Sequence, residues 1–159
     1  MFNQRYKKYS GIVLIVLTIL FILIQFLPSS FSRTNPPVTG GPKWDSPETQ
    51  QTFSRLCADC HSNETQFPWY SAIAPASWFV ESDVAAGRKH FNVSTWDKSE
   101  QGGDDAADQV NKGAMPIGSY LMMHPGANLN VKEKKQFVEG LQKTFGSSST
   151  SDDDKEESK

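Results

Sequence analysis

The pattern of apolar and polar positions changes sharply near the start of the chain and predicts its first element. Residues 11–27 are almost continuously apolar, with Gln25 as the one strongly polar member. This run of 17 residues is at the lower limit for a membrane-spanning helix and exceeds the apolar core of a typical signal peptide. Arg5, Lys7 and Lys8 precede it without any acid, a bias that keeps the N-terminus inside the cell. We expect residues 1–10 to be a cytoplasmic flank and residues 11–27 a transmembrane anchor or, alternatively, a cleaved signal peptide.

Helical periodicity next appears in the middle of the chain. Ser46 is a good N-cap, Pro47 suits the first helical position, and Phe53, Leu56 and Cys57 then follow at helical spacing. This pattern predicts a helix that begins at residue 46 or 47 and runs toward a cysteine-containing segment. A second helix-compatible stretch covers residues 77–90.

The last periodic stretch predicts a C-terminal helix. Asn130 is its candidate N-cap and Gly146 its candidate end. We expect five apolar residues to face a core, namely Val131, Phe137, Val138, Leu141 and Phe145. No strand pattern stands out between these helices, so the expected fold class is all-α, with one small domain over residues 46–145.

The segments on either side of that domain are polar. Residues 28–45 are rich in Pro, Ser, Thr and Gly, which predicts an extended, mobile linker. Residues 146–159 contain a block of acids and no apolar side chain, which predicts a disordered tail. The net charge of −2 leaves no basic surface of the kind that binds nucleic acid, so that class of partner is excluded.

The only two cysteines lie in a five-residue motif that carries the strongest chemical signal. Cys57-Ala58-Asp59-Cys60-His61 matches C-x-x-C-H, the attachment sequence for c-type haem. Two thiols three residues apart on a helical turn can bond to one porphyrin, and His61 on the same face can ligate its iron. We therefore expect one covalent haem per chain, with His61 as proximal ligand and the haem filling much of the small core.

Three other interpretations of the motif remain open at this point. A thioredoxin-like redox pair would need a βαβ context, which the sequence does not suggest. A zinc site would need a second pair of ligands, for which His90 and His124 are too scattered. A structural disulfide would leave the adjacent histidine without a role.

A sixth iron ligand is expected if the haem carries electrons. Met115 is the favoured candidate, because the following proline disfavours helix and places the thioether in a loop. Met122, Met123 and His124 are alternatives, with His90 a weaker one, and the site could also be open. Met122 and Met123 look more like packing residues, since methionine more often fills a core than binds a metal.

Several further residues could contact the haem. Trp69, Tyr70 and Trp78 could line it or hydrogen-bond its propionates, or they could simply be core residues. Arg88 could pair with a propionate carboxylate, or it could be a solvated residue at a helix end.

The residues that follow the haem motif carry a wider resemblance. The segment CADCHSNETQFPWYSAIAPASWFV, and later pieces around residues 87–92, 115–120 and 124–129, resemble the bacterial haem-binding domain family of c-type cytochromes. That resemblance covers roughly residues 46–145, with mild departures at Gly126 and Asn128. It implies a cytochrome c-like helical fold, haem attached at Cys57 and Cys60, His61 as proximal ligand and Met115 as distal ligand.

These features together predict a function. We expect a membrane-anchored, extracytoplasmic c-type cytochrome of the bacterial inner membrane that transfers electrons between redox partner proteins. The alternatives are a haem-based sensor or a peroxidase-like enzyme with an open sixth iron site, or a binding module in which haem is only structural.

Overall fold

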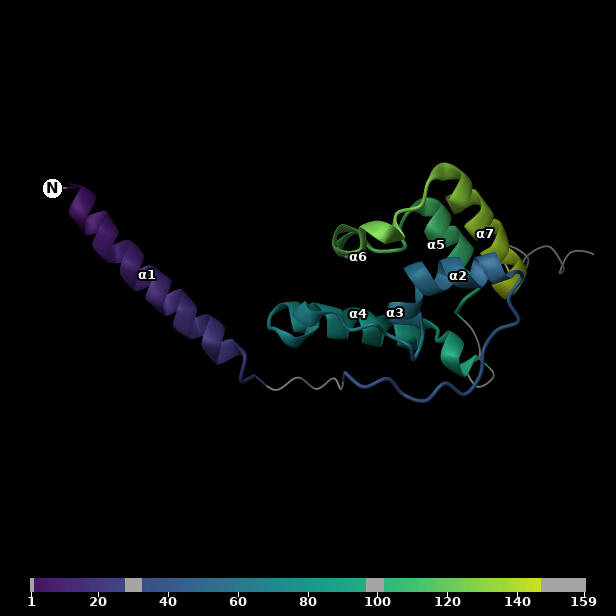
Figure 1. The fold of residues 1–159 in the computed structure, drawn as a ribbon, viewed down its shortest axis with the longest axis horizontal. Coiled ribbons are helices and arrows are strands. Elements are labelled where there is room, and N and C mark those ends of the chain that lie inside the picture. The colour runs from purple at the N-terminus through teal and green to yellow at the C-terminus, as the bar shows by residue number, and fades with distance from the viewer. Residues whose placement is uncertain (1, 28–32, 97–101, 147–159) are drawn as a thin grey trace, which may run out of the picture. The chain divides into compact units, whose positions relative to one another are not determined.

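The computed structural model of the 159-residue chain describes residues 2–27, 33–96 and 102–146. Figure 1 shows the order of the helices along the chain. Every regular element in the described residues is helical, which confirms the predicted all-α class. The helices are α1 (Phe2–Ile24), α2 (Pro47–Leu56), α3 (Ala58–His61), α4 (Ala76–His90), α5 (Ala106–Lys112), α6 (Gly118–Met123) and α7 (Val131–Phe145), with 3-10 turns η1 (Trp69–Ala72), η2 (Val93–Thr95) and η3 (Pro125–Ala127).

The chain divides into two compact units. The first comprises Met1–Thr34 and Phe67–Asp83, and the second comprises Asn35–Gln66 and Val84–Lys159. Within the first unit, the side-chain amide of Gln25 donates to the carbonyl of Ala74 at 3.1 Å and accepts from the Ala74 amide at 3.0 Å. Arg33 also donates to the carbonyl of Ser71 at 2.9 Å. These bonds connect the end of the N-terminal segment to the region around η1.

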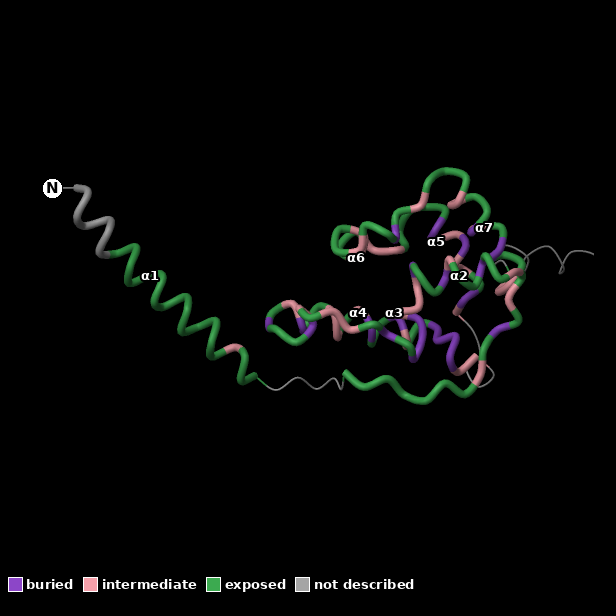
Figure 2. Tube along the Cα trace, in the orientation of Figure 1, coloured by how far each residue is buried: buried purple, intermediate pink, exposed green. Residues whose placement is uncertain are grey.

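Nearly all residues of α1 whose burial is described are exposed (Figure 2), and most of them are apolar. The predicted transmembrane anchor is not supported: in the part of the chain that is described, no helix is both long and apolar enough to cross a membrane.

Local capping explains where α2 and α7 begin. The Ser46 side chain accepts from the Thr49 amide at 3.1 Å, and Pro47 is the first residue of α2, as predicted. Asn130 and Glu133 form a reciprocal capping box at the start of α7, with both hydrogen bonds at 2.9 Å. Each of these bonds satisfies a backbone amide that the helix itself cannot pair.

The core of the second unit lies around α2 and α7. Its buried apolar residues include Phe53, Leu56, Phe91, Val110, Phe137 and Leu141. Helices α2 and α7 approach closely at Gly140, where an added Cβ would clash with Oγ1 of Thr49. Val131 was predicted to face the core but is 89% exposed, because it occupies the first turn of α7, nine residues before that contact.

Part of the expected linker belongs to the second unit and is hydrogen-bonded within it. The backbone amides of Thr39 and Gly40 both donate to the carbonyl of Ser94, at 2.8 and 3.0 Å. The carbonyl of Pro37 accepts from the side chain of Asn63 at 2.8 Å. We call residues 35–40 the strap. Residues 28–32 and the predicted tail from residue 147 onward lie outside the described residues.

Candidate haem site

The haem motif begins where α2 ends. Cys57 is both the C-cap of α2 and the N-cap of α3. Its carbonyl accepts from the amides of Cys60 and His61, at 3.1 and 2.9 Å, so the motif forms a single helical turn. Such a turn brings side chains three and four residues apart to one face, which is the arrangement that attachment to one porphyrin requires.

The cysteines do not support the three alternative interpretations of the motif. Cys57 and Cys60 form no disulfide with each other. The described residues contain no strand for a thioredoxin-like context and no group of three or more His, Cys, Asp or Glu that could hold a metal ion. Burial, and then the proximity of Cys60, raises the pKa of the Cys57 thiol, so it stays protonated at neutral pH.

His61 is oriented by a backbone carbonyl from α4's C-terminal end. The side chain is only 8% exposed, and its Nδ1 lies 3.2 Å from the carbonyl oxygen of Phe91. Its ring also stacks on the ring of Phe91, with centroids 4.1 Å apart and planes at 19°. A carbonyl can only accept, so Nδ1 carries the proton and Nε2 keeps its lone pair.

The protonation state of His61 suits metal binding. Burial lowers the pKa of His61 below its ordinary value, while the hydrogen bond to the Phe91 carbonyl opposes that shift. The imidazole is therefore neutral at pH 7. A neutral histidine with Nδ1–H held by a carbonyl and Nε2 available is the form that ligates a haem iron.

Helix α4 reaches α3 at a glycine. A Cβ added at Gly87 would lie 2.5 Å from the carbonyl oxygen of Cys60 and 2.8 Å from its Cβ. Only a residue without a side chain permits this contact between the two backbones. The contact places Phe91, one turn later on the chain, beside His61.

Arg88 follows Gly87 and joins three segments of the second unit. Its guanidinium donates to the carbonyl of Ser62 at 2.9 Å, to Oδ1 of Asn35 at 2.8 Å and to Oγ1 of Thr65 at 2.9 Å. It is thus not a simply solvated residue at a helix end. Its predicted pairing with a haem propionate stays a prediction, because these contacts involve other partners.

A second hydrogen bond connects the haem motif to α6. The hydroxyl of Tyr120 donates to Oδ2 of Asp59 at 2.7 Å, and the Tyr120 ring stacks on His124 with centroids 4.0 Å apart. Burial, and then the bond to Asp59, raises the pKa of the Tyr120 hydroxyl, so it remains a proton donor. This contact places α6 beside the turn that carries both cysteines.

The methionine candidates lie in α6 and in the loop before it, and all three are exposed. Met115 lies in the loop between α5 and α6, as its proline predicts, and is partly exposed. Met122 and Met123 are 77% and 50% exposed, so the prediction that they pack in the protein core was wrong. None of the residues of α6 is buried.

The remaining candidates occupy other surroundings. Trp69 and Tyr70 lie in η1 of the first unit, where their rings meet edge to face at 5.8 Å and Trp69 is largely exposed. Their role as haem contacts stays a prediction. His90 pairs with Asp105 at 3.2 Å, and its exposed side chain suits the surface role that the sequence suggested.

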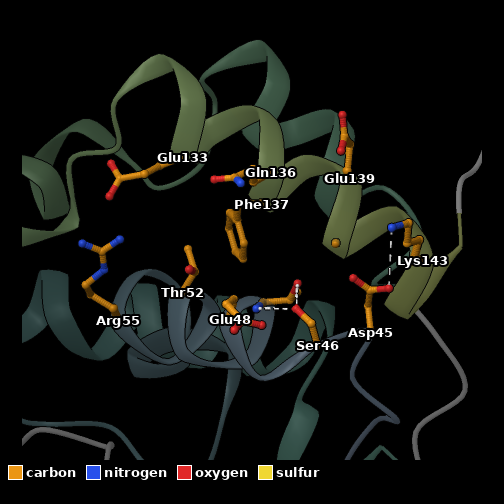
Figure 3. Close-up of a pocket in the computed structure, with 12 residues that line it drawn as sticks. Asp45, Ser46, Glu48, Thr52, Arg55, Glu133, Gln136, Phe137, Glu139 and Lys143 are labelled. Atoms are coloured by element: carbon orange, nitrogen blue, oxygen red, sulfur yellow. Dashed lines mark hydrogen bonds and ion pairs between the residues drawn. The ribbon is translucent and has the colours of Figure 1, made fainter.

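A polar groove of about 350 Å³ lies between α2 and α7 (Figure 3). Arg55 and Glu133 lie toward one end of it, and Asp45 lies 3.8 Å from Lys143 at the other. None of the residues that line it belongs to the predicted site. Its carboxylates are balanced in part by the cations Arg55 and Lys143.

Sequence reasoning missed the residues that hold His61. Phe91 acts through a backbone carbonyl, which has no signature in a sequence. Asn63, Asn92 and Ser94 are buried polar residues near it. The available signal was the resemblance to the family, which includes Asn63 directly after the haem motif and Phe91 and Asn92 in the piece at residues 87–92.

Comparison with known proteins gives one family match. Residues 19–143 match a family model that is described as a haem-binding domain. The match includes both cysteines, His61 and all the methionine candidates. No curated protein matches the chain. No solved structure matches it either.

Proposed function

Because this chain belongs to the haem-binding domain family, we propose that it is a c-type cytochrome that carries one covalent haem and transfers electrons. Cys57 and Cys60 attach the group: each thiol adds across one vinyl, forming an S–C bond while its hydrogen goes to the neighbouring carbon. His61 is the proximal ligand. The observation that supports this most directly is the bond from His61 Nδ1 to the Phe91 carbonyl, which leaves Nε2 available.

Electron transfer is the function that suits these ligands best. The bound haem supplies an iron that cycles between the ferric and ferrous states. His61 is held rigidly by its hydrogen bond and its stacking on Phe91, so little reorganisation accompanies a change in charge. Met115 is the proposed distal ligand, since a thioether opposite histidine is the usual pair in electron-carrying cytochromes c. The partners would be other redox proteins.

Covalent attachment is tested by mass. We expect protein made together with a cytochrome c maturation system to keep the mass of one haem after denaturation. A C57A/C60A variant, made in the same way, should lose that mass, because both thioether bonds are gone. A denatured wild-type chain without added haem mass would reject the c-type assignment.

The distal ligand separates the electron carrier from the sensor or peroxidase-like alternative. Met115→Ala should leave haem attached, because attachment uses residues 57, 60 and 61. It should lower the reduction potential, because a thioether favours ferrous iron more than water does, and it should allow carbon monoxide to bind. Absorption spectra and potentiometric titration measure both effects.

Three substitutions serve as controls for Met115. Met122→Ala, Met123→Ala and His124→Ala should each leave the spectrum and the potential close to wild type. If unmutated ferrous protein already binds carbon monoxide readily, the sixth site is open and the sensor or peroxidase-like function replaces the electron carrier.

Haem attachment of this type takes place outside the cytoplasm, so we propose an extracytoplasmic location at the bacterial cytoplasmic membrane. The basic residues at positions 5, 7 and 8 and the apolar run after them would direct export. Cell fractionation with N-terminal sequencing tests this. Holoprotein in the cytoplasmic fraction would contradict it, and the first residue found shows whether the segment is removed.

A further inference from the structure

A buried network of polar side chains lies beside the proximal histidine. The side-chain amide of Asn63 donates to the carbonyl of Pro37 at 2.8 Å, and its Oδ1 accepts from Asn92 at 2.8 Å. The backbone amide of Asn63 donates to Oγ of Ser94 at 2.9 Å. Oδ1 of Asn92 accepts from the Ser94 amide, also at 2.9 Å. Asn63, Asn92 and Ser94 are all buried, so each of these bonds replaces water that cannot reach them.

The strap completes this network. The carbonyl of Ser94 accepts from the amides of Thr39 and Gly40, and the Pro37 carbonyl accepts from Asn63. Three positions of the strap are therefore bonded to two residues of the network. Arg88 adds a further bond between Asn35 and the loop that follows the haem motif.

Residues of the network lie next to both partners of the hydrogen bond that orients His61. Asn63 comes two residues after His61, and Asn92 comes directly after Phe91, whose carbonyl accepts from Nδ1 of His61 at 3.2 Å. The direct bond between Asn63 and Asn92 therefore joins the chain segment of the imidazole to the segment of its acceptor. Movement of either segment would change the length of the His61–Phe91 hydrogen bond.

We propose that Asn63 is a positioning residue that, together with Asn92, Ser94 and the strap, holds the Phe91 carbonyl against His61 and so sets how strongly His61 donates to iron. This proposal rests on the proposed function, in which His61 binds the haem iron. A stronger Nδ1–H bond makes an imidazole a more basic ligand, which favours ferric over ferrous iron. Loss of the network should thus weaken the ligand and raise the reduction potential.

The test uses full-length holoprotein with covalent haem, in the Asn63→Ala and Ser94→Ala variants. Asn63→Ala removes the side-chain hydrogen bonds to Pro37 and Asn92. Ser94→Ala is milder, because it removes only the hydroxyl that accepts from the backbone amide of Asn63. We expect both to raise the reduction potential, Asn63→Ala by more. In NMR spectra of the ferrous protein labelled with 15N-histidine, the Nδ1–H signal of His61 should move upfield and exchange several-fold faster with deuterium.

Asn130→Ala is the matched control. It removes an asparagine whose side chain also makes structural hydrogen bonds, at the N-cap of α7, and it should destabilise the protein without a change in potential or in the Nδ1–H signal. The proposal is overturned if Asn63→Ala leaves both readouts unchanged, or changes them no more than Asn130→Ala does.

Two further outcomes are separated by design. If Asn63→Ala does not fold or mature, Ser94→Ala decides alone: an unchanged potential and Nδ1–H signal overturn the proposal, and a shift in both supports it. Haem mass is measured on every sample. Wild-type protein without covalent haem contradicts the proposed function itself, whereas variants that keep haem and an unshifted potential contradict only the role of Asn63.

Discussion

His61→Ala should abolish the low-spin haem spectrum and sharply reduce the yield of holoprotein. The substitution removes an imidazole that is buried and therefore neutral at pH 7. This imidazole is hydrogen-bonded to the Phe91 carbonyl and lies in the same helical turn as both cysteines. It also leaves the Phe91 carbonyl without its partner in a buried site, which costs about 1–3 kcal/mol. Absorption spectra and haem content per chain, measured after purification, give the result.

His90→Ala is the control for that experiment. The His90 ring is 6.5 Å from the His61 ring but bonds to Asp105 and is exposed, so its loss should leave the spectrum unchanged. A His61→Ala protein with wild-type haem content and a low-spin spectrum would show that another residue is the proximal ligand. A His90→Ala protein that loses the low-spin spectrum would show that His90 is one of the two iron ligands.

The second large effect is expected at Gly87. In Gly87→Ala the new Cβ would lie 2.5 Å from the carbonyl oxygen of Cys60, so the backbone of α3 or α4 has to move. Alanine gains about 1 kcal/mol over glycine in helix propensity, but displacing a packed backbone costs about 3 kcal/mol. The clash therefore outweighs the gain. A net loss of about 2 kcal/mol corresponds to a fall in Tm of roughly 8–16 °C for a domain of this size.

Gly118→Ala is the matched substitution in another helix. A Cβ at Gly118 meets nothing within 4 Å, so the Tm should stay the same or rise slightly. Thermal unfolding of both variants, followed by circular dichroism, measures the difference. Equal Tm values for the two variants would mean that α4 does not pack on Cys60 as closely as the structure indicates.

The longer helices could be predicted because their signals are local. Ser46, Asn130 and Gly146 are capping residues whose hydrogen bonds involve their own neighbours, and Pro47 is suited to the first helical position by its fixed φ. Helices α5 and α6 were not predicted, because they have seven and six residues and α6 has no buried side chain to mark a face. Val131 was misjudged for a related reason, since spacing identifies a face but not how far along the helix its partner extends.

The hydrogen bonds of the expected linker could not be predicted from the sequence either. Its Pro, Ser, Thr and Gly content is typical of a mobile segment. Composition does not show whether such a segment forms hydrogen bonds with residues far away in the sequence. Thr39 and Gly40 nevertheless donate to the Ser94 carbonyl, more than fifty residues later. Backbone amides make these bonds, so residue identity in the strap gives little sign of them.

The sequence alone determined the chemistry of the motif: two thiols and an imidazole on one helical turn depend only on spacing within five residues. Tertiary structure decided which nitrogen of His61 is available. That choice depends on the Phe91 carbonyl, 30 residues later, and on Gly87, which lets α4 approach α3 closely enough to place it. Every residue has a carbonyl, so only the packing of the two helices selects the one that holds the imidazole.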